Sequence, residues 1–411
     1  MSKSYEEANK QKPRYWKNKP VMKLDEKIYT SEQISGDENL SRFKKNEFTQ
    51  LPIGYTWNKI DVCDDLEMVN VCEFLSEHYK RGSESIYIIK YDTERIQWEM
   101  SNTGYFLTIC FENKIIGLIG FTYRTVQIHA DRHTMTEPMY MCCEKKYRGK
   151  GIAKVLMDET IRQSLLTGIN KGVFCDNRIV PKPIVTLRQY SRSLNYKKLR
   201  ENEFVEIHGI DDDVVHNKTK INLKPNKRYV VATNTEENIN LVYDLYRQYM
   251  KTFSFHMVLT KKDIENYMFN EKYVKTVLVM SDDDSVKTPV DFITYNFYDI
   301  ININNKDGDN IIKTANLLMY SSNEIRPDLI FINILKQMSF DKIHNVFVMD
   351  MMHNNEFILS NVKNADEDTD DEEENSTYDM NIGKTGKKLF INLFNWKCGT
   401  FKQNMISWLT F

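Results

Sequence analysis

Cysteine is scarce in this sequence and forms no recognisable pattern. The 411 residues include seven cysteines, an odd number without a Cys-x-x-Cys pair, and eight dispersed histidines. A secreted disulfide framework normally needs an even and regularly spaced set. The paired-ligand spacing of a structural zinc site is also missing. We therefore expect neither a disulfide scaffold nor a metal site.

The sequence also lacks a charge excess, a long apolar run and an apolar leader. Lys and Arg number 56 against 58 Asp and Glu, a net charge of −2, whereas a DNA-binding domain usually carries a basic excess. The longest apolar stretch, residues 115–121, is far shorter than the ~20 residues that cross a bilayer. The opening MSKSYEEANKQK is polar throughout, unlike a secretory signal peptide. We expect a soluble, cytoplasmic, monomeric protein without nucleic-acid partners or an integral membrane segment.

The chain does contain enough apolar material for folded cores. Hydrophobic residues make up 41% and aromatic residues 12%, too much for a disordered chain. The length suits about two or three domains. We expect an arm and linker at residues 1–50, a first half at 51–226 and a second half at 227–411. Residues 365–379 of the second half form an acidic loop, either an inert solvated insertion or a docking segment for a basic partner.

Helical and strand patterns alternate in both halves, so the expected fold class is α/β (α+β). Apolar residues at helical spacing predict helices, and short apolar runs bounded by turn residues predict strands. The expected helices are residues 66–79, 152–166, 238–253 and 326–338. The expected strands are residues 105–110, 115–123, 139–143, 173–175, 204–207, 277–280, 290–297, 317–320, 346–351 and 390–394.

One segment carries a recognisable chemistry. The strand at residues 139–143 leads through Arg148-Gly149-Lys150-Gly151-Ile152-Ala153 into a helix. Glycines let the backbone approach a ligand closely, and the N–H groups at a helix N-terminus attract anions. Nearby basic side chains add positive charge, so the pattern favours a pyrophosphate group. A bland surface turn is the alternative.

Several blocks of sequence then point to one family. Arg-x-x-Gly-x-Ala at residues 148–153 resembles the acyl-CoA-binding turn of the general N-acetyltransferase superfamily. Residues 180–195 (VPKPIVTLRQYSRSLN), 15–24 (YWKNKPVMKL), 51–57 (LPIGYTW) and 395–398 (NWKC) resemble blocks of the glycylpeptide N-tetradecanoyltransferases, or N-myristoyltransferases. The blocks occur in the family's order from about residue 12 to the end of the chain. The resemblance implies two fused GNAT-like acyltransferase halves related by pseudo-two-fold symmetry. The first half would bind myristoyl-CoA and the second would form most of the peptide groove.

The resemblance also implies a role for individual residues. The co-substrate myristoyl-CoA would contact the arm, the strand that ends at Cys143 and the glycine turn, at Arg14, Tyr15, Trp16, Tyr140, Met141, Cys142, Cys143, Arg148, Gly149, Lys150, Gly151, Ile152 and Ala153. The backbone N–H groups of Tyr140 and Met141 would form the oxyanion hole for the thioester carbonyl. The N-terminal glycine peptide of a client protein would contact Tyr79, Glu84, Tyr87, Cys175, Asp176, Tyr320 and Asn354.

In this family the general base is the carboxylate at the end of the chain, here that of Phe411. A peptide α-amine has a pKa near ~8 and is mostly protonated at neutral pH, so it must lose a proton before it attacks. Desolvation raises the pKa of a carboxylate and lowers that of an amine, so a carboxylate within hydrogen-bonding distance can accept the proton. A frayed, inactive chain end is the alternative.

This chain also departs from the family pattern. Met139 stands where the family has an Asn that helps to bind the amine, and Cys175 stands where it has a Thr. Of the acidic loop that favours a substrate lysine, only Glu84 remains. The reduced glycine segment at residues 382–386 imitates a nucleotide P-loop, but Tyr378 occupies the required upstream glycine position, so we reject that interpretation. The departures predict an altered peptide preference. They also leave open a weak or inactive acyl-CoA- or peptide-binding homologue, or an acyltransferase of altered acyl or acceptor specificity.

Overall fold

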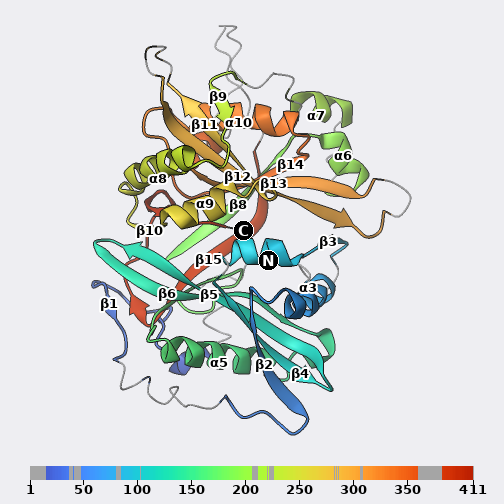
Figure 1. The fold of residues 1–411 in the computed structure, drawn as a ribbon, viewed down its shortest axis with the longest axis vertical. Coiled ribbons are helices and arrows are strands. Elements are labelled where there is room, and N and C mark those ends of the chain that lie inside the picture. Colours follow the sequence, from blue (N-terminus) through green and yellow to red (C-terminus); the bar gives the residue numbers. More distant parts are fainter. Residues whose placement is uncertain are drawn as a thin grey trace. The chain divides into compact units, whose positions relative to one another are not determined.

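The chain folds into two compact units of mixed helix and sheet. The computed structural model describes residues 15–36, 40, 48–79, 85–101, 103–205, 212–219, 221, 226–281, 283, 285, 287–305, 309–359 and 382–410. Unit 1 comprises Met1–Ser85, Lys90–Thr186 and Lys388–Lys402, and unit 2 comprises Ile86–Ile89, Leu187–Lys387 and Gln403–Phe411. The boundary thus lies earlier in the chain than residue 227, and a late segment returns to unit 1 (Figure 1). The functional roles assigned to the two halves stay predictions.

Unit 1 is built on a mostly antiparallel sheet that contains one parallel pair of strands. Strands β2, β4, β5 and β6 pair antiparallel in that order, β7 is parallel to β6, and β15 is antiparallel to β7. Helices α3 and α4 lie between β2 and β4 in the chain, and α5 lies between β6 and β7. The bounds are β2 (Tyr55–Asp61), α3 (Asp65–His78), α4 (Thr93–Glu99), β4 (Tyr105–Phe111), β5 (Lys114–Ile128), β6 (Asp131–Cys143), α5 (Ile152–Leu166), β7 (Gly172–Asp176) and β15 (Gly383–Phe394), whose residues from Lys388 on belong to unit 1.

Short elements complete unit 1. A 3-10 helix η1 (Trp16–Asn18) begins the described part of the chain, and another, η3 (Lys145–Tyr147), follows β6. Strand β1 (Glu32–Gln33) pairs with β16 (Trp396–Lys397).

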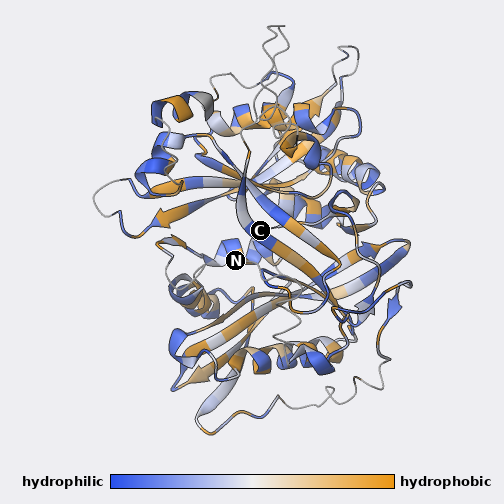
Figure 2. Ribbon diagram, turned by 180° about the vertical axis from the view of Figure 1, so that it is seen from behind, coloured by the Kyte–Doolittle hydropathy of each residue, from blue (hydrophilic) through white to orange (hydrophobic). Residues whose placement is uncertain are grey.

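Different helices cover the two faces of the unit 1 sheet. Phe106 and Leu118 belong to the core cluster formed with α3 and α4, whereas their neighbours Leu107 and Ile119 belong to the cluster formed with α5. Successive strand side chains point to opposite faces, so the sheet is buried on both sides. This explains why the sequence around residues 115–121 is almost continuously apolar rather than alternating (Figure 2).

A tight hairpin turn joins β4 to β5. Its two central residues, Glu112 and Asn113, have φ angles of 50° and 60°. Positive φ at both central positions is the type I′ geometry, whose twist matches that of the paired strands. The hairpin confirms the two strands and short turn expected from the sequence.

Unit 2 repeats the topology of unit 1. Strand β9, helices α8 and α9, antiparallel strands β11, β12 and β13, helix α10 and parallel strand β14 follow one another, and β8 then pairs antiparallel with β14. The bounds are β8 (Val185–Ser193), whose residues from Leu187 on belong to unit 2, β9 (Tyr229–Val231), α8 (Glu236–Met250), α9 (Lys261–Phe269), β11 (Val274–Met280), β12 (Pro289–Asn302), β13 (Ile311–Tyr320), α10 (Pro327–Phe340) and β14 (Asn345–Met349). The shared order confirms the expectation of two α/β halves of similar construction.

Smaller elements complete unit 2. They are β3 (Tyr87–Ile89), α6 (Tyr196–Glu201), α7 (Asp212–Thr219), β10 (Phe255–Met257), α11 (Asn355–Ile358), the 3-10 helix η4 (Gln403–Met405) and β17 (Ile406–Ser407). Strand β3 pairs with β12, and β17 pairs with β10.

Most expected elements are confirmed, and most strands are longer than the sequence suggests. The strand expected at residues 346–351 is an exception, because β14 ends at Met349. Strand β6 begins at Asp131 because it forms a hairpin with β5, whose end at Ile128 pairs with that residue. The strand expected at residues 204–207 is wrong for Phe204 and Val205, which are irregular, and its other residues lie outside the described part of the chain. The rejected P-loop lies in strand β15, where Thr385 donates a hydrogen bond to the carbonyl of Gln189 at 3.1 Å.

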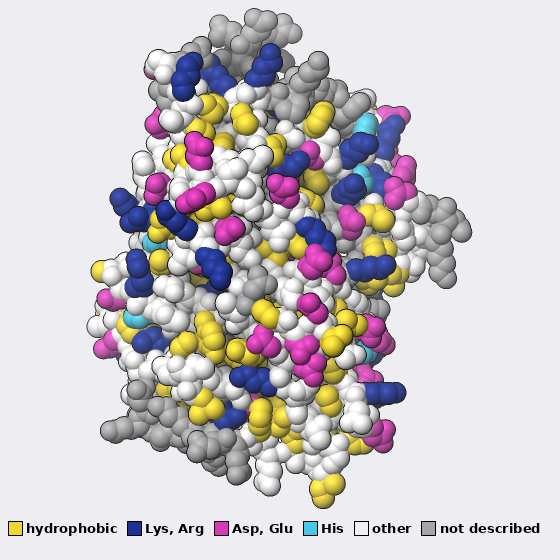
Figure 3. Space-filling view, in the orientation of Figure 1, with side chains coloured by type: hydrophobic (Ala, Val, Ile, Leu, Met, Phe, Trp, Pro, Cys, Tyr) yellow, Lys and Arg dark blue, Asp and Glu magenta, His cyan; other side chains and the backbone are white. Residues whose placement is uncertain are grey.

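Two further observations concern the surface and the helices. Basic and acidic side chains are interspersed on the face drawn in Figure 3, in keeping with a net charge of −2. Across the described residues, no helix has both the length and the apolar character needed to cross a bilayer. The acidic loop expected at residues 365–379 lies outside the described residues.

Candidate functional site

The turn between β6 and α5 is open and depends on its glycines. Gly149 and Gly151 have φ angles of 77° and 87°, and Gly151 is the N-cap residue of α5. A Cβ added at either position would meet nothing within 4 Å. Glycine is therefore required by the left-handed backbone and not by crowding. Ile152 and Ala153 then begin the helix, so the expected strand, turn and helix are all present, and the exposed helix N-terminus is able to accept an anion.

Basic side chains surround this turn. The Arg148 guanidinium donates a hydrogen bond from Nε to the Cys143 carbonyl at 3.1 Å, which ties the turn to the end of β6. The Lys146 and Lys150 ammonium groups each lie 5.0 Å from the ring centre of Tyr147. Both lysines are exposed. The turn therefore combines backbone donors with positive charge, as a phosphate site requires.

A β-bulge interrupts β6 a few residues before the turn. In the ladder between β5 and β6, Ile119 stands opposite Tyr140 and Met141 together. Tyr140 has a φ angle of 54°, which is rare for a bulky residue. A bulge of this kind redirects consecutive backbone groups and is often found beside active sites. The predicted oxyanion-hole residues thus form the irregular step of the strand.

The Tyr140 ring is surrounded by other aromatic rings. Its centre lies 5.9 Å from that of Tyr79, 5.8 Å from that of Tyr91 and 6.0 Å from that of Phe106. Tyr79 follows the last residue of α3 and is 41% exposed. The structure therefore brings Tyr79, a predicted peptide-binding residue, into contact with the bulge.

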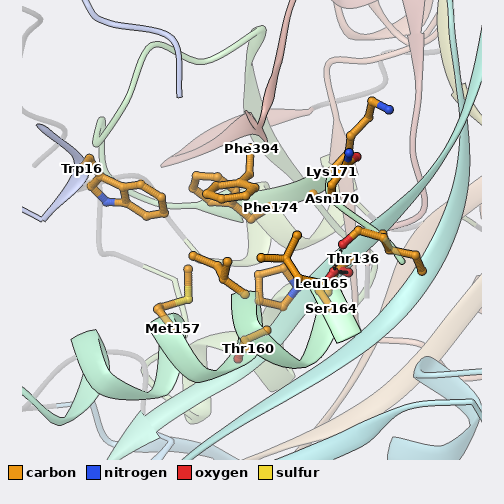
Figure 4. A pocket seen from close by; sticks show the side chains of 14 residues that line it. Trp16, Thr136, Met157, Thr160, Ser164, Leu165, Asn170, Lys171, Phe174 and Phe394 are labelled. Carbon is orange, nitrogen blue, oxygen red and sulfur yellow. Dashed lines mark hydrogen bonds between the residues drawn. The ribbon is translucent and has the colours of Figure 1, made fainter. Parts of the chain in front are cut away.

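An apolar pocket opens where β6 and β7 separate. In the described part of the chain, these parallel strands pair only at Thr136 and Gly172. The pocket holds about 440 Å³ of empty space, part of which is open to solvent. In Figure 4, Trp16, Phe174 and Phe394 line it opposite the side chains of α5. Its full lining is Trp16, Thr136, Pro138, Met157, Thr160, Ile161, Ser164, Leu165, Ile169, Asn170, Lys171, Gly172, Phe174 and Phe394.

The described beginning of the chain covers one side of this pocket. The Trp16 ring stacks on Phe174 with centres 5.0 Å apart and an angle of 5° between the planes. The Tyr15 hydroxyl donates a hydrogen bond to Asp158 of α5 at 2.9 Å, and the Lys19 ammonium pairs with the same carboxylate. Burial, reinforced by the charge of Asp158, raises the pKa of Tyr15, so its hydroxyl remains a donor. Residues 15–19 are thereby held against α5 and β7.

The cysteines among the predicted site residues, Cys142, Cys143 and Cys175, are neutral thiols. Burial raises the pKa of Cys142 to about 12, and it also raises the pKa of Cys143. Cys175 is half-buried, and desolvation followed by the charges of Glu137 and Asp176 raises its pKa. None of the three is therefore poised to act as a nucleophile.

Asp176 is the other predicted peptide-binding residue at the end of β7. Its carboxylate accepts a hydrogen bond from the backbone N–H of Arg178 at 2.9 Å and lies 3.4 Å from the Arg178 guanidinium. The Arg178 side chain is 75% exposed, so this ion pair is weak and leaves Asp176 able to accept another donor.

Three predicted peptide-binding residues belong to unit 2 and make structural contacts there. The Tyr87 hydroxyl donates to the Asn202 carbonyl at 3.0 Å, and burial raises its pKa to about 12. The buried Asn354 amide donates to the Met349 carbonyl at 2.8 Å. Tyr320 packs with Tyr249, and burial raises its pKa well above the ordinary value.

Sequence reasoning missed the residues that link this part of unit 2. The Tyr249 hydroxyl lies 2.7 Å from Nδ1 of His353, and the ring centres of Tyr249 and Tyr320 are 5.7 Å apart. His353 directly precedes Asn354 in the chain. The only sequence signal was the place of Tyr249 within the helix predicted for residues 238–253, which gave no reason to associate it with His353.

Unit 2 fills its own counterpart of the glycine turn with a carboxylate. The turn between β13 and α10 wraps around Asp291, a fully buried residue of β12. Asp291 accepts hydrogen bonds from the backbone N–H groups of Asn323, Glu324 and Ile325 at 2.6, 3.0 and 2.8 Å, and from the Ser321 hydroxyl at 2.8 Å. The anion-binding position that is open in unit 1 is therefore occupied by the protein itself in unit 2.

Some predicted positions are not described, and no metal cluster is found among those that are. Arg14, Glu84 and Phe411 lie outside the described residues, so their roles stay predictions. Within the described ranges, no group of three or more His, Cys, Asp or Glu side chains is placed to hold a metal ion.

Comparisons with known proteins agree with this geometry. Residues 33–187 match the family model for the myristoyl-CoA:protein N-myristoyltransferase N-terminal domain. A probable glycylpeptide N-tetradecanoyltransferase of Caenorhabditis elegans is 23% identical, over 98% of this chain and 86% of that protein. The glycylpeptide N-tetradecanoyltransferase of Plasmodium falciparum is 23% identical, over 96% of this chain and 92% of that protein.

The fold matches solved structures over nearly the whole chain. A crystal structure of Saccharomyces cerevisiae N-myristoyltransferase with bound myristoyl-CoA has a TM-score of 0.79 at 18% identity, covering 94% of this chain and 93% of that one. A structure of the yeast enzyme with bound myristoyl-CoA and inhibitors has a TM-score of 0.81 at 17% identity, covering 94% and 90%. The glycine turn, the family-model match and the relatives aligned along almost the full length agree: this chain is similar in sequence and fold to the N-myristoyltransferases.

Proposed function

We propose that this protein transfers a myristoyl group from myristoyl-CoA to the N-terminal glycine amine of protein substrates. One observation carries the proposal: an apolar pocket, a backbone bulge and an anion-binding turn follow one another along β6. Pro138 lines the pocket, Tyr140 and Met141 form the bulge, and Gly149 to Gly151 form the turn that follows the strand. An acyl-CoA has the same order of parts, from the acyl chain through the thioester to the phosphates.

Each part suits one portion of the co-substrate. The pocket would take the acyl chain, where each buried methylene contributes about 0.8 kcal/mol. The bulge would place the Tyr140 and Met141 N–H groups on the thioester oxygen, and an oxyanion-hole donor is typically worth about 3 kcal/mol in the transition state. The turn at Gly149 and Gly151 would hold the phosphates.

The reaction then needs a neutral amine. Its nitrogen attacks the thioester carbon, a carbon–nitrogen bond forms, and the carbon–sulfur bond breaks. The departing CoA thiolate takes the second proton lost by the nitrogen and becomes the free CoA thiol. The proton lost from the ammonium group goes to a base, which we expect to be the carboxylate of Phe411. If this carboxylate is the base, residues added after Phe411 abolish transfer while myristoyl-CoA still binds. Full activity of such an extended protein would refute the assignment.

We assign myristoyl-CoA to unit 1 and most of the peptide groove to unit 2. The contrast between the two turns supports this division, because Gly149 and Gly151 leave the unit 1 turn open whereas Asp291 fills its counterpart. We therefore expect one myristoyl-CoA per chain in a calorimetric titration. The free thiols of all seven cysteines support a reducing, cytoplasmic location as part of the same proposal.

A second candidate, a slow enzyme or an acyl-CoA-binding homologue, is favoured by one observation. Cys175 and Met139 occupy the positions of two family residues that bind the amine. Cys175 is a half-buried neutral thiol, which is a weak hydrogen-bonding group. Of the two residues at the end of β7, only Asp176 offers a charged acceptor for the ammonium group.

One experiment separates the candidates. The full chain is incubated with myristoyl-CoA and a peptide beginning with glycine, and the released CoA thiol is followed. Turnover that disappears when the peptide amine is acetylated supports the proposed transferase. Thermal stabilisation by myristoyl-CoA without turnover supports the binding homologue. Turnover only with shorter acyl-CoA or with a lysine side chain as acceptor would indicate altered specificity.

A further inference from the structure

The bulge at Tyr140 has a dedicated support that does not belong to the pocket or the glycine turn. The φ angle of 54° places Tyr140 in a region that a bulky residue rarely adopts without help from its surroundings. The Tyr140 hydroxyl donates a hydrogen bond to Oε2 of Glu99, the last residue of α4. The side chain is thus anchored at its tip to a neighbouring helix.

Glu99 is itself held from two sides. Its other carboxylate oxygen, Oε1, accepts a hydrogen bond from Nε of Arg95 at 2.8 Å, one turn earlier on α4. Its backbone carbonyl accepts a hydrogen bond from Nη2 of Arg124 on β5 at 2.9 Å. Arg124 in turn donates from Nε to Glu137 on β6 at 2.7 Å. Two arginines and two glutamates thereby form a charge-balanced network under the bulge.

This network is buried. The exposed fractions are 7% for Arg95, 4% for Glu99, 4% for Arg124 and 8% for Glu137. A buried polar network whose members are hydrogen-bonded to one another is rigid, because losing any one contact leaves a charge without a partner in a medium of low dielectric constant. The Glu99 carboxylate is therefore a fixed acceptor and not a mobile surface group.

The hydroxyl and the ring of Tyr140 are fixed independently. The rings of Tyr79, Tyr91 and Phe106 lie around the Tyr140 ring and restrict where it can go. These ring contacts do not fix where the Tyr140 side chain lies along β6, because stacked or edge-on rings can shift relative to one another without losing contact. The hydrogen bond to Glu99 does fix that position, since a hydrogen bond is directional.

We propose that Glu99 is a positioning residue for acyl transfer: by holding the Tyr140 hydroxyl, it keeps the backbone N–H groups of Tyr140 and Met141 aimed at the thioester oxygen. The inference rests on the proposed function, because it assigns the oxyanion hole to these two groups. Without the anchor, the Tyr140 backbone is free to relax toward an ordinary strand conformation, which turns the amides away from the reacting carbonyl. Oxyanion stabilisation depends on donors that are already aligned before the reaction begins.

The test uses Tyr140→Phe, which removes the hydroxyl and leaves the ring and the backbone groups, and Glu99→Gln, which retains an acceptor oxygen but not the charge. We expect kcat to fall by about tenfold or more in Tyr140→Phe, with KM for myristoyl-CoA within about twofold, because alignment of the hole matters most in the transition state. Glu99→Gln should lose less activity than Glu99→Ala. The double variant Tyr140→Phe/Glu99→Gln should be no slower than the slower single variant, since both changes act on the same contact.

The chain offers a matched control in unit 2. The buried Tyr295 hydroxyl donates to Oδ2 of Asp341 at 2.7 Å, and Lys275 pairs with the same carboxylate at 2.7 Å. Tyr295→Phe removes the same kind of hydrogen bond, so it should lower the melting temperature without lowering kcat. A kcat loss in Tyr140→Phe that is no larger than that in Tyr295→Phe overturns the inference.

The outcomes distinguish the inference from the proposed function. If the unaltered protein releases CoA with the glycine peptide and Tyr140→Phe keeps kcat within about twofold, the positioning role is wrong and the transferase proposal stands. If the unaltered protein shows no turnover with any acyl-CoA or acceptor tested, the transferase proposal fails and the positioning role fails with it. Additive losses in the double variant also contradict the inference, because they show that Glu99 and Tyr140 act separately.

Discussion

Replacing Asp291 with alanine is expected to destabilise the protein more than most single substitutions. Its carboxylate is fully buried and accepts four hydrogen bonds, three from backbone N–H groups of the turn before α10 and one from the Ser321 hydroxyl. No other side chain can take over these donors from the same position on β12. The substitution therefore removes the acceptor around which the whole turn is organised.

The size of the effect follows from the donors left behind. A buried donor without a partner costs about 1–3 kcal/mol, so three orphaned backbone groups should lower the free energy of unfolding by about 3–6 kcal/mol if water reaches some of them. That is a large fraction of the roughly 5–15 kcal/mol by which native proteins are stable. Asp291→Asn keeps one carbonyl oxygen as an acceptor and should lose about half as much.

Urea-induced unfolding followed by far-ultraviolet circular dichroism measures the loss. The control is Asp283→Ala, because Asp283 also accepts a backbone N–H, that of Ser285 at 2.8 Å, but at an exposed position where water can replace it. A loss below about 1 kcal/mol for Asp291→Ala would refute the reasoning, since it would mean that the donors do not depend on the carboxylate.

The same variant tests whether the unit 2 turn is an occupied anion-binding position. With the carboxylate gone, inorganic phosphate can approach the three N–H groups. Phosphate at about 100 times its dissociation constant would restore about 2.7 kcal/mol. We expect phosphate to stabilise Asp291→Ala and not the unaltered protein. Equal stabilisation of both proteins would contradict this interpretation of the turn.

Three further predictions concern unit 1. Asp158→Asn weakens the hydrogen bond from Tyr15 that holds residues 15–19 against α5. It should raise KM for myristoyl-CoA and make residues 15–19 more sensitive to limited proteolysis. An unchanged KM would show that residues 15–19 do not cover the ligand. Gly151→Ala places a side chain at a φ angle of 87°, which should cost about 1 kcal/mol of stability and weaken myristoyl-CoA binding in calorimetry. Burial raises the pKa of Cys142 to about 12 from an ordinary value near 9, so its stabilising contribution is complete below pH ~9 and is lost as the pH rises toward 12. The melting temperature should therefore fall above pH ~9, and Cys142→Ala should reduce that slope.

Local sequence patterns predicted the parts of unit 1 whose conformation depends on neighbouring residues in the chain. Helix α5 has the expected bounds because the glycine turn ends the preceding strand and Gly168, with a φ angle of 82°, follows the helix. The hairpin between β4 and β5 was predictable from two apolar runs separated by polar residues. The anion turn was predictable because glycines, basic residues and a helix start occur together at residues 148–153.

The bulge and its support were not predictable in this way. Nothing in the sequence around Tyr140 indicates that β6 contains an extra residue relative to β5, because register is a property of the pair of strands. Helix α4 has only seven residues, too few for a periodic pattern to be distinctive. No pattern in this segment gives a reason to join Glu99 to a tyrosine 41 residues away.

The sequence by itself determined the α/β character of both halves and the place of the anion turn, because these depend on short-range patterns of glycine, charge and apolar periodicity. Its blocks also showed the resemblance to the N-myristoyltransferases. Only the tertiary structure decided which of the two repeated turns is open, since the acceptor Asp291 that fills the second one comes from a different strand. It also decided that Tyr140 stands in a strained bulge anchored to Glu99. Both features depend on contacts between residues far apart in the chain, whose energies appear only when burial removes water as the competing hydrogen-bond partner.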